Sequence, residues 1–402
     1  MRESRIKTLV LHAQYTTRLS YYDDWLDAFR AARQFDVVAL DICRRHAGQA
    51  LRLALAEAEL VVLLHSTNGD TTIYLEPLAP LLAARRAVLL SFVGNEFNAV
   101  GSPISAKRRL FAQIRPDIIA TQLLQEAGEH LFGDLAGQVI AVPHALNPEA
   151  FRPERAGRER TIDIGVRAAR YLPHLGDDDR NRVHDLFARA RFEPPLSVDV
   201  GSERLTRADW SRFLNACRGT VSCEAGSWYL ERDDATVEAI RRWTRARLGG
   251  RLVIANDSAL RRLGHKLPWG LRALLRRALS AGPLRHEVTV NEQLSHADVH
   301  TRFFADQPRP PVYGKCISSR HFDAIGTKTC QIMLPGRYND LLVADRDYIA
   351  LASDFANLDD ALARFRDAGY RQAMVDGVYE RVLAEHTYRH RIDRVADAVS
   401  AS

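Results

Sequence analysis

The sequence predicts an α/β protein with two doubly wound, Rossmann-like domains. Short runs rich in Leu, Val and Ile alternate with longer amphipathic segments, and this rhythm stops once near residue 150 and then restarts. Alternation of this kind predicts parallel strands covered by helices on both faces. A chain of 402 residues also exceeds the size at which one hydrophobic core keeps growing, so two domains are expected.

The first domain is expected over residues 1–150, where each apolar run is followed by a segment with helical spacing. The runs expected to form its strands are 7–13, 36–42, 60–66, 87–93, 117–122 and 138–143. The amphipathic segments between them are 22–34, 48–58, 74–85, 104–114 and 123–132. We expect this domain to be a parallel sheet with helices on both sides.

The second domain is expected over 151–375, after an interdomain stretch rich in Pro and charge at 144–160. Its expected strands are 161–168, 196–202, 219–227, 314–319, 330–334 and 347–351, and its helices include 177–190, 207–217 and 320–326. A mostly helical, basic insertion interrupts this domain at about 228–312. The last segment, 376–402, is expected to form a helix that packs back on the first domain.

Composition and absent motifs exclude several classes of protein. Apolar residues make up 46 % of the chain and charged residues 26 %, no apolar run reaches the roughly 18 residues of a membrane span, and the first thirty residues lack a cleavage-site pattern. A cytoplasmic protein is therefore expected. The five cysteines are widely spaced without a CxxC pair, and Walker A, GxGxxG, HExxH and GxSxG motifs are absent. We expect neither a metal nor a cofactor, and no nucleic-acid partner.

The segment 318–328 combines hydroxyl groups, both signs of charge and a glycine. Ser318 or Ser319 would cap a two-turn helix, and Gly326 would end it as the residue just beyond its last turn. Such a helix starts at the carboxyl edge of the sheet, where its amide groups and Arg320 would suit a phosphate, while Asp323 could accept hydrogen bonds from a ribose diol. This mixture suggests a nucleotide diphosphate. A plain capped surface helix is the alternative.

The residues around this helix resemble a known family. The stretch "ISSRHFDAIGTKTCQIMLPGRYNDLLVADRDYIAL" and the later "RVLAEHTYRHRIDRV" resemble the C-terminal half of GT-B glycosyltransferases of the group-1 superfamily. They are most similar to the bacterial subgroup of spore-maturation glycosyltransferase-like proteins. In addition, "VPHALNPEAFRP" is similar to the superfamily's interdomain segment, and "IDIGVRAARYLPHLG" to the first strand and loop of its donor domain.

The resemblance implies a two-domain GT-B fold that transfers a sugar from a nucleotide-sugar donor, held by the second domain, to a carbohydrate or lipid-linked acceptor held by the first. It also implies retention of configuration and no metal. A nucleotide-sugar 2-epimerase is an alternative with the same fold. A degenerate nucleotide-sugar-binding protein without catalysis is an alternative from another class.

The resemblance also assigns candidate catalytic residues. The group-1 pattern has two Glu residues with seven residues between them, and Asp323 takes the second position, whereas Lys315 stands where the first would be. Glu224, in "CEAGS", would then be the displaced first Glu, separated from its partner by the insertion and meeting it in space. A turn role for Glu224 beside Gly226 is the alternative.

Positive groups are needed to stabilise the departing diphosphate. The candidates for donor binding are Arg167, Arg170, Ser318, Ser319, Arg320, Asp323 and Lys328, and each charged one could instead be a solvated surface group. On the acceptor side, His65, Asn95 and Glu96 end or follow expected strands and would face the cleft. A structural role for His65 or a turn role for Asn95 is the alternative.

The basic insertion carries the net charge of the protein. Residues 257–285 contain seven Arg and Lys side chains against one Asp, which accounts for the formal charge of +6. The stretch "WGLRALLRRALS" would form an amphipathic helix that contacts an anionic membrane surface, as would suit an enzyme of polysaccharide biosynthesis. A lid helix whose Leu face is buried in the protein is the alternative.

Overall fold

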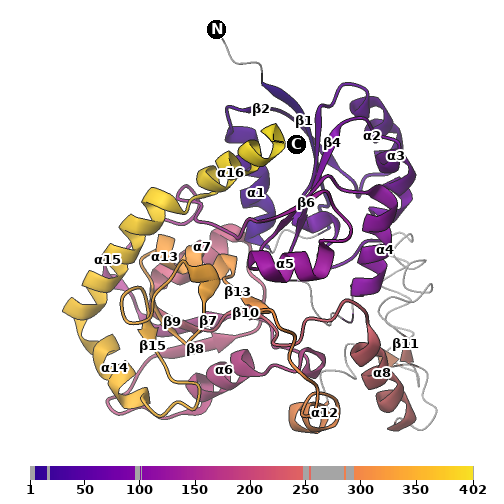
Figure 1. Ribbon diagram of the computed structural model, residues 1–402. Helices are drawn as coiled ribbons and strands as arrows, with labels where there is room; N and C mark the ends of the chain where they lie inside the picture. Colours follow the sequence, from indigo (N-terminus) through magenta and orange to yellow (C-terminus); the bar gives the residue numbers. More distant parts are fainter. Residues whose placement is uncertain are drawn as a thin grey trace.

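A computed structural model of the chain describes residues 5–15, 19–95, 100, 102–247, 253–254, 285–286 and 294–401. Two parallel sheets lie in separate lobes, and the chain crosses between them (Figure 1). The predicted two Rossmann-like sheets are therefore confirmed.

The first sheet is six-stranded within the described residues, with the order β2-β1-β3-β4-β5-β6, and every pairing is parallel. Its strands are β1 (Ile6–His12), β2 (Phe35–Asp41), β3 (Leu60–Leu63), β4 (Val88–Val93), β5 (Ile118–Thr121) and β6 (Gln138–Ala141). Its helices are α1 (Ser20–Ala31), α2 (Ala47–Leu55), α3 (Ala79–Ala83), α4 (Ile104–Ile114) and α5 (Gln125–Phe132). Short 3-10 turns η1 (His65–Thr67) and η2 (Glu76–Leu78) follow β3.

Both faces of this sheet are buried, which explains the nearly continuous apolar runs in the sequence. Leu9 and Leu11 of β1 pack into one core with α2 to α5, whereas Val10 between them packs into the opposite core with Trp25 of α1. The period-two alternation of a strand thus sends neighbouring residues into two different cores.

The second sheet has the order β15-β14-β9-β7-β8 and is also parallel. Its strands are β7 (Ile162–Arg167), β8 (Val198–Gly201), β9 (Cys217–Ser222), β14 (Cys330–Met333) and β15 (Ile349–Ala350). Its helices are α6 (Asp179–Arg189), α7 (Arg207–Ala216), α13 (Ser319–Gly326), α14 (Leu358–Arg366) and α15 (Ala368–Glu385). The core with Ile164 and Val221 includes residues of α6 and α14, and the core with Leu214 and Phe322 includes residues of α7, α13 and α15.

The insertion leaves and re-enters the second domain at one point. β10 (Ala225–Gly226) pairs antiparallel with β13 (Lys315–Cys316), so the two ends of the inserted segment lie side by side. Between them are α8 (Ala235–Arg247), α12 (His296–Phe303) and the parallel pair β11 (Val253–Ile254) and β12 (Arg285–His286). Tyr229, Ile240, Val299 and Phe304 form a small core of its own. Nearly all of 257–285 lies outside the described residues, so its predicted membrane or lid role stays a prediction.

The insertion also contacts the first domain. Asp234, just before α8, accepts hydrogen bonds from the backbone amides of Ile104 (2.9 Å) and Ser105 (3.2 Å) at the start of α4. A carboxylate at this position satisfies amides that a helix start leaves without an internal partner. The insertion therefore spans both domains beside the cleft.

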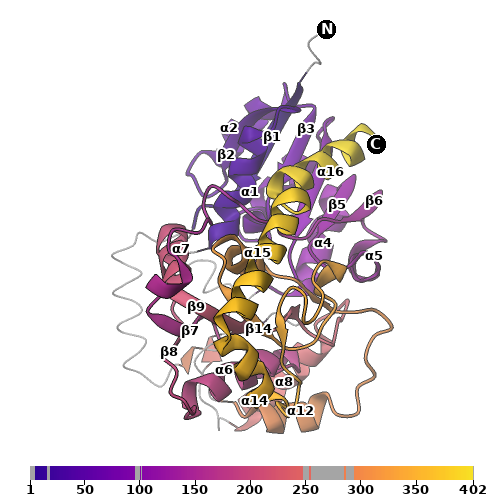
Figure 2. The ribbon, with the colours of Figure 1, turned by 90° about the vertical axis from the view of Figure 1, so that its left-hand side faces the viewer.

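The end of the chain returns to the first domain. α16 (Tyr388–Ser400) follows α15, and Figure 2 shows the two helices running along one side of the molecule from the second sheet to the first. Tyr388 packs edge-on against Trp25 of α1, with ring centroids 4.9 Å apart. No helix in the described ranges is both long and apolar enough to cross a membrane.

Candidate active site

A cleft of about 360 Å³ lies between the carboxyl edges of the two sheets. This is where parallel α/β sheets place ligands, because the loops after the strands converge there. Its first-domain wall is formed by Leu19, Ser20, Tyr21, Asp70, Asn95, Gln122 and His144. Its second-domain wall is formed by Arg167, Ala169, Arg170, Tyr171, Arg180, Glu203, Arg204, Leu205, Trp210, Ala225, Ser318, Ser319, Arg320 and Asp323. We call these the first-domain wall and the second-domain wall.

Helix α13 begins at the second-domain wall. Ser318 is its N-cap, and the backbone amide of Ser318 donates to Nδ1 of His321 (3.0 Å). Burial, followed by the charge of Arg180, lowers the pKa of His321 to about 3, so its ring is neutral and can accept this bond. The first-turn amides of the helix and its positive dipole end thus lie beside the cleft.

The end of α13 corrects one expectation about Gly326. Gly326 is the last helical residue, and the residue with a left-handed backbone is Lys328, with φ of 53°. A Cβ on Gly326 would lie 2.5 Å from Leu146 and 2.6 Å from the carbonyl oxygen of Phe151. The glycine is therefore required because the interdomain segment packs directly on the helix.

Three arginines of the second-domain wall have no ion-pair partner among the described residues. Within the described residues, Arg180, Arg204 and Arg320 have no carboxylate within ion-pair distance; Arg180 stacks on the ring of Tyr171 at 3.8 Å. Burial, followed by the like charge of Arg180, lowers the pKa of Arg320 to about 10. The same two arginines, after burial, lower the pKa of His184. Like charges gathered in this way favour the binding of an anion.

Arg167 and Arg170 also line the cleft, as predicted, but each is held by acidic residues. Arg167 forms an ion pair with Asp199 (2.8 Å) and another with Glu203. Arg170 pairs with Asp185 at 2.6 Å. Their charge is therefore already balanced within the second domain.

Asp323 lies on α13 at the floor of the cleft and is 2 % exposed. Nε1 of Trp210 donates to its Oδ2 at 2.9 Å. Burial, with a contribution from Asp24, raises the pKa of Asp323 well above its usual range. A carboxyl group fixed by an indole in this way can still accept hydrogen bonds from a ligand through its other oxygen.

The structure corrects the prediction for Glu224. Ala225 lines the cleft, but the Glu224 side chain does not; it is 3 % exposed and points to the turn at 336–340. Its Oε1 accepts from the backbone amide of Tyr338 (2.6 Å) and its Oε2 from the hydroxyl of Tyr313. Asp323 has separate partners, so the expected meeting of the two carboxylates is not seen. Sequence spacing could not foresee this turn.

The turn held by Glu224 connects the two domains. Tyr338, Asn339 and Asp340 all have positive φ, between 46° and 61°, which is rare for residues other than glycine. Asn339 donates to the carbonyl oxygen of Gln122 in the first-domain wall (3.0 Å), and Arg337 pairs with Glu126 at 2.8 Å. We call residues 336–340 the bridging turn.

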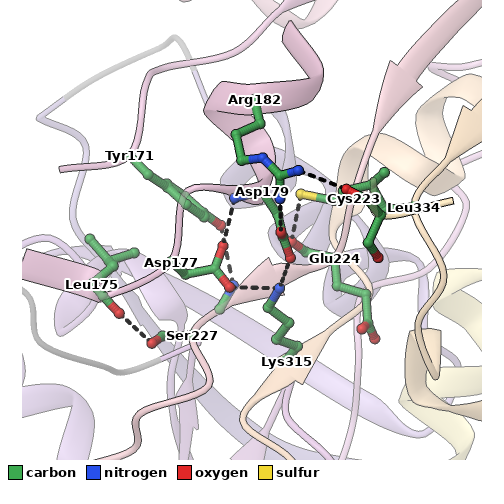
Figure 3. A network of polar contacts seen from close by, with 12 residues as sticks. Tyr171, Leu175, Asp177, Asp179, Arg182, Cys223, Glu224, Ser227, Lys315 and Leu334 are labelled. Carbon is green, nitrogen blue, oxygen red and sulfur yellow. Dashed lines mark hydrogen bonds and ion pairs between the residues drawn. The ribbon is translucent and has the colours of Figure 1, made fainter. Parts of the chain in front are cut away.

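Lys315, at the position of the superfamily's first Glu, belongs to a buried network (Figure 3). Its Nζ lies 2.6 Å from Asp177 and 2.5 Å from Asp179, and over the ring of Trp228 at 4.6 Å. Figure 3 shows the Glu224 side chain extending away from this network. Lys315 therefore holds the loop before α6 against the ends of the insertion, and its charge is neutralised there.

The other predicted residues divide into three groups. Ser318, Ser319 and Asn95 line the cleft. Lys328 does not; it pairs with Asp376 of α15 at 2.5 Å, which corrects its donor-binding assignment. His65 is buried behind the wall, 5.1 Å from the His144 ring centroid, and Glu96 lies outside the described residues.

Sequence reasoning missed Arg180, Arg204, Trp210, Tyr21 and Asp70. Arg180 follows the acidic run 177–179, and Arg204 follows the strand β8. The signal that could have found most of them is position, since they lie just beyond strand ends or in the first turns of the following helices.

Comparisons with known proteins agree with this architecture. Residues 232–397 match the model of a family described as glycosyl transferase-like. The chain is similar in structure to HepE of Anabaena solved with UDP-glucose, with a TM-score of 0.50 and 9 % identity over 99 % of this chain and 100 % of that one. It is also similar to a UDP-forming trehalose-phosphate synthase of Burkholderia vietnamiensis, with a TM-score of 0.45 and 11 % identity over 99 % and 100 % of the two chains. No curated protein matches the chain.

The match to the family model confirms the resemblance read from residues 317–351, and the fold agrees over the full chain. The chain thus has the GT-B fold, and residues 232–397 are similar to the glycosyl transferase-like family.

Proposed function

We propose that this protein is a glycosyltransferase that moves a sugar from a nucleotide-diphosphate sugar to a hydroxyl group of an acceptor. The observation that carries the proposal is the cluster of Arg180, Arg204 and Arg320, which has no carboxylate partner in the described chain and lies beside the start of α13. A diphosphate supplies the negative charge that this arrangement lacks.

The chemistry follows from where charge develops. When the bond between the sugar and the diphosphate breaks, negative charge accumulates on the leaving phosphate oxygen. Guanidinium groups and helix amides that already point into the cleft stabilise that charge without reorganising during the step. Asp323, fixed by Trp210, is placed to accept hydrogen bonds from the ribose of the same nucleotide.

We further propose that the arginines take the place of a metal and that the sugar keeps its anomeric configuration, as the resemblance to the superfamily implies. Turnover that persists in EDTA would support the first point. The anomeric configuration of the product, read by NMR at early times, decides the second.

The experiment that tests the function is a thermal-shift screen with UDP, GDP, TDP and CMP, followed by a transfer assay. UDP comes first, because HepE was solved with UDP-glucose. A ligand that binds only the folded state raises the melting temperature. An absence of stabilisation by every nucleoside diphosphate would contradict the proposal.

The transfer assay separates the alternatives. Product formation that depends on added acceptor identifies a transferase, and release of a free sugar inverted at C2 without acceptor identifies a 2-epimerase, because hydrolysis of the donor leaves C2 unchanged. Tight donor binding without either product would identify a binding protein.

A further inference from the structure

The first-domain wall of the cleft differs in charge from the wall that it faces. Among its described residues Asp70 is the one charged side chain, whereas the second-domain wall includes five arginines. His144 adds no positive charge, because burial lowers its pKa to about 3. A phosphate or carboxylate on a ligand at this wall would therefore face a like charge, and no described residue of the first-domain wall offers it a cationic partner.

Asp70 is held in the cleft by local structure. The turn η1 ends at Thr67, and two residues later the amide of Gly69 donates to the carbonyl oxygen of His65 (2.8 Å). Asn68 is buried and donates through Nδ2 to the carbonyl oxygen of Phe92 (2.9 Å), which fixes the turn against β4. Asp70 thus follows a rigid turn and has an exposed side chain at the end of β3.

One oxygen of the Asp70 carboxylate is fixed and the other is open. The hydroxyl of Tyr15 donates to Oδ2 at 3.2 Å, and that of Tyr22 lies 3.5 Å from the same atom. Burial raises the pKa of both phenols, so they remain protonated donors at neutral pH. No described residue hydrogen bonds to Oδ1. The two hydroxyls also lie 3.0 Å apart, so Tyr22 holds Tyr15, which in turn holds the carboxylate. The open acceptor oxygen of a carboxylate held in this way suits the hydroxyl groups of a ligand.

Tyr21 provides an aromatic surface next to this carboxylate. Tyr21 lines the cleft. Its ring packs edge-on against that of Tyr22 and lies tilted against that of His144, and the ring centroids are 4.7 Å apart in each of the two pairs. Its ring is therefore held from two sides. A sugar ring has C–H faces that pack on aromatic rings and hydroxyl edges that bind carboxylates and amides, such as those of Asp70, Asn95 and Gln122.

We propose that the first-domain wall is the subsite for an uncharged sugar acceptor, with Asp70 binding its hydroxyl groups and Tyr21 packing on its ring. This proposal rests on the proposed function, since it names the class of acceptor that the transferase uses. It excludes sugar phosphates and uronic acids as the residue that receives the transferred sugar.

The test compares acceptor classes and matched variants. Glycan-array binding in the presence of UDP, and transfer from the donor that stabilises the protein best, are measured for neutral oligosaccharides, sugar phosphates and uronic-acid glycans. We expect neutral glycans to bind and react, and Asp70→Ala to raise the acceptor KM at least tenfold. In the same Asp70→Ala variant, the rate of donor hydrolysis, with water as acceptor, should stay within twofold of the wild-type rate. Asp36→Asn, at an exposed aspartate of β2, is the control.

Several results would overturn the proposal. These are a preference for phosphorylated or uronic-acid glycans, an absence of neutral glycan binding, and an unchanged acceptor KM in both Asp70→Ala and Tyr21→Leu. If Asp70→Ala does not fold, Asp70→Asn replaces it, because it keeps the size of the side chain. Failure of the proposed function looks different: no nucleotide stabilises the protein, while glycan binding on the array still reports on this wall.

Discussion

The two walls of the cleft are built in the same way but differ in chemistry. Each consists largely of residues that follow the carboxyl ends of parallel strands or begin the next helix. The second-domain wall gathers arginines without carboxylate partners in the described chain, and the first-domain wall presents one exposed carboxylate beside a tyrosine. The topology thus determines where ligands bind, and a few side chains in the loops determine which ligand each wall takes.

Removing the positive charge of the second-domain wall should have the largest effect. Each charge-assisted hydrogen bond contributes about 1.5–3 kcal/mol, so the double variant Arg180→Ala with Arg320→Ala should weaken UDP binding by at least ~100-fold in calorimetry. Arg52→Ala, at an exposed arginine of α2, should bind UDP normally. Normal UDP affinity in the double variant would show that the diphosphate binds elsewhere.

The interface behind the walls gives a prediction about pH. Asp24 of α1 is 1 % exposed and accepts from Arg207 of α7 (2.8 Å) and Asn147 (2.7 Å), so it connects the two domains. Burial outweighs these partners and raises the pKa of Asp24 from 3.8 to about 6. The folded state therefore binds the Asp24 proton more tightly than the unfolded state does. Protonated Asp24 contributes to the free energy of unfolding below pH 4, and this contribution is lost as the pH rises through 6.

The expected loss is up to ~3 kcal/mol, from about 1.4 kcal/mol per pKa unit. Asp24→Asn cannot ionise, so its free energy of unfolding relative to wild type should rise between pH 4 and 7. Urea unfolding of both proteins at several pH values measures this difference in the free energy of unfolding. The other titrating groups are the same in both proteins, so their effects cancel in the difference. A flat difference would mean that Asp24 remains ionised in the folded protein.

A third prediction decides whether Glu224 acts on the sugar or on the bridging turn. Glu224→Ala leaves the buried amide of Tyr338 without an acceptor, and we expect a loss of about 1–3 kcal/mol in the free energy of unfolding. Glu224→Gln keeps an acceptor oxygen, so its free energy of unfolding should stay close to that of wild type. Its turnover should stay within a few-fold of wild type. Normal stability with turnover reduced more than 100-fold in the Gln variant would instead identify Glu224 as catalytic.

The smallest effect sharpens the role of Asp323. Trp210→Phe removes the hydrogen bond to Asp323, which is worth about 1 kcal/mol, so UDP should bind roughly fivefold more weakly. If Asp323 binds the ribose diol, the Trp210→Phe substitution should weaken the binding of 2′-deoxy-UDP less than it weakens the binding of UDP. Equal losses for both ligands would place Asp323 away from the ribose.

The fold could be predicted from the sequence because buried parallel strands appear in it as continuous apolar runs. The expected runs 60–66 and 87–93 contain β3 and β4, whose residues are buried on both faces. Ser318 and Arg320 were found for a similar reason, since a helix start after a strand is visible locally. Strands and helix starts depend on residues that are neighbours in the chain, and the sequence shows those neighbours directly.

The partners of side chains could not be predicted in this way. Glu224 and Lys328 have types that suit a donor site, but Tyr338 and Asp376, which bind them, come from distant segments. Arg180 follows three aspartates in the chain, of which Asp177 and Asp179 pair with the distant Lys315. Tertiary contacts decide which charges stay available for a ligand.

The antiparallel pair of β10 and β13 has a consequence for how the second domain could be shortened. Gly226 lies directly opposite Lys315, a spacing that a two-residue hairpin turn would close without moving either strand. The second domain is therefore continuous across that pair. A short turn in place of residues 227–314 would leave both paired strands where they are.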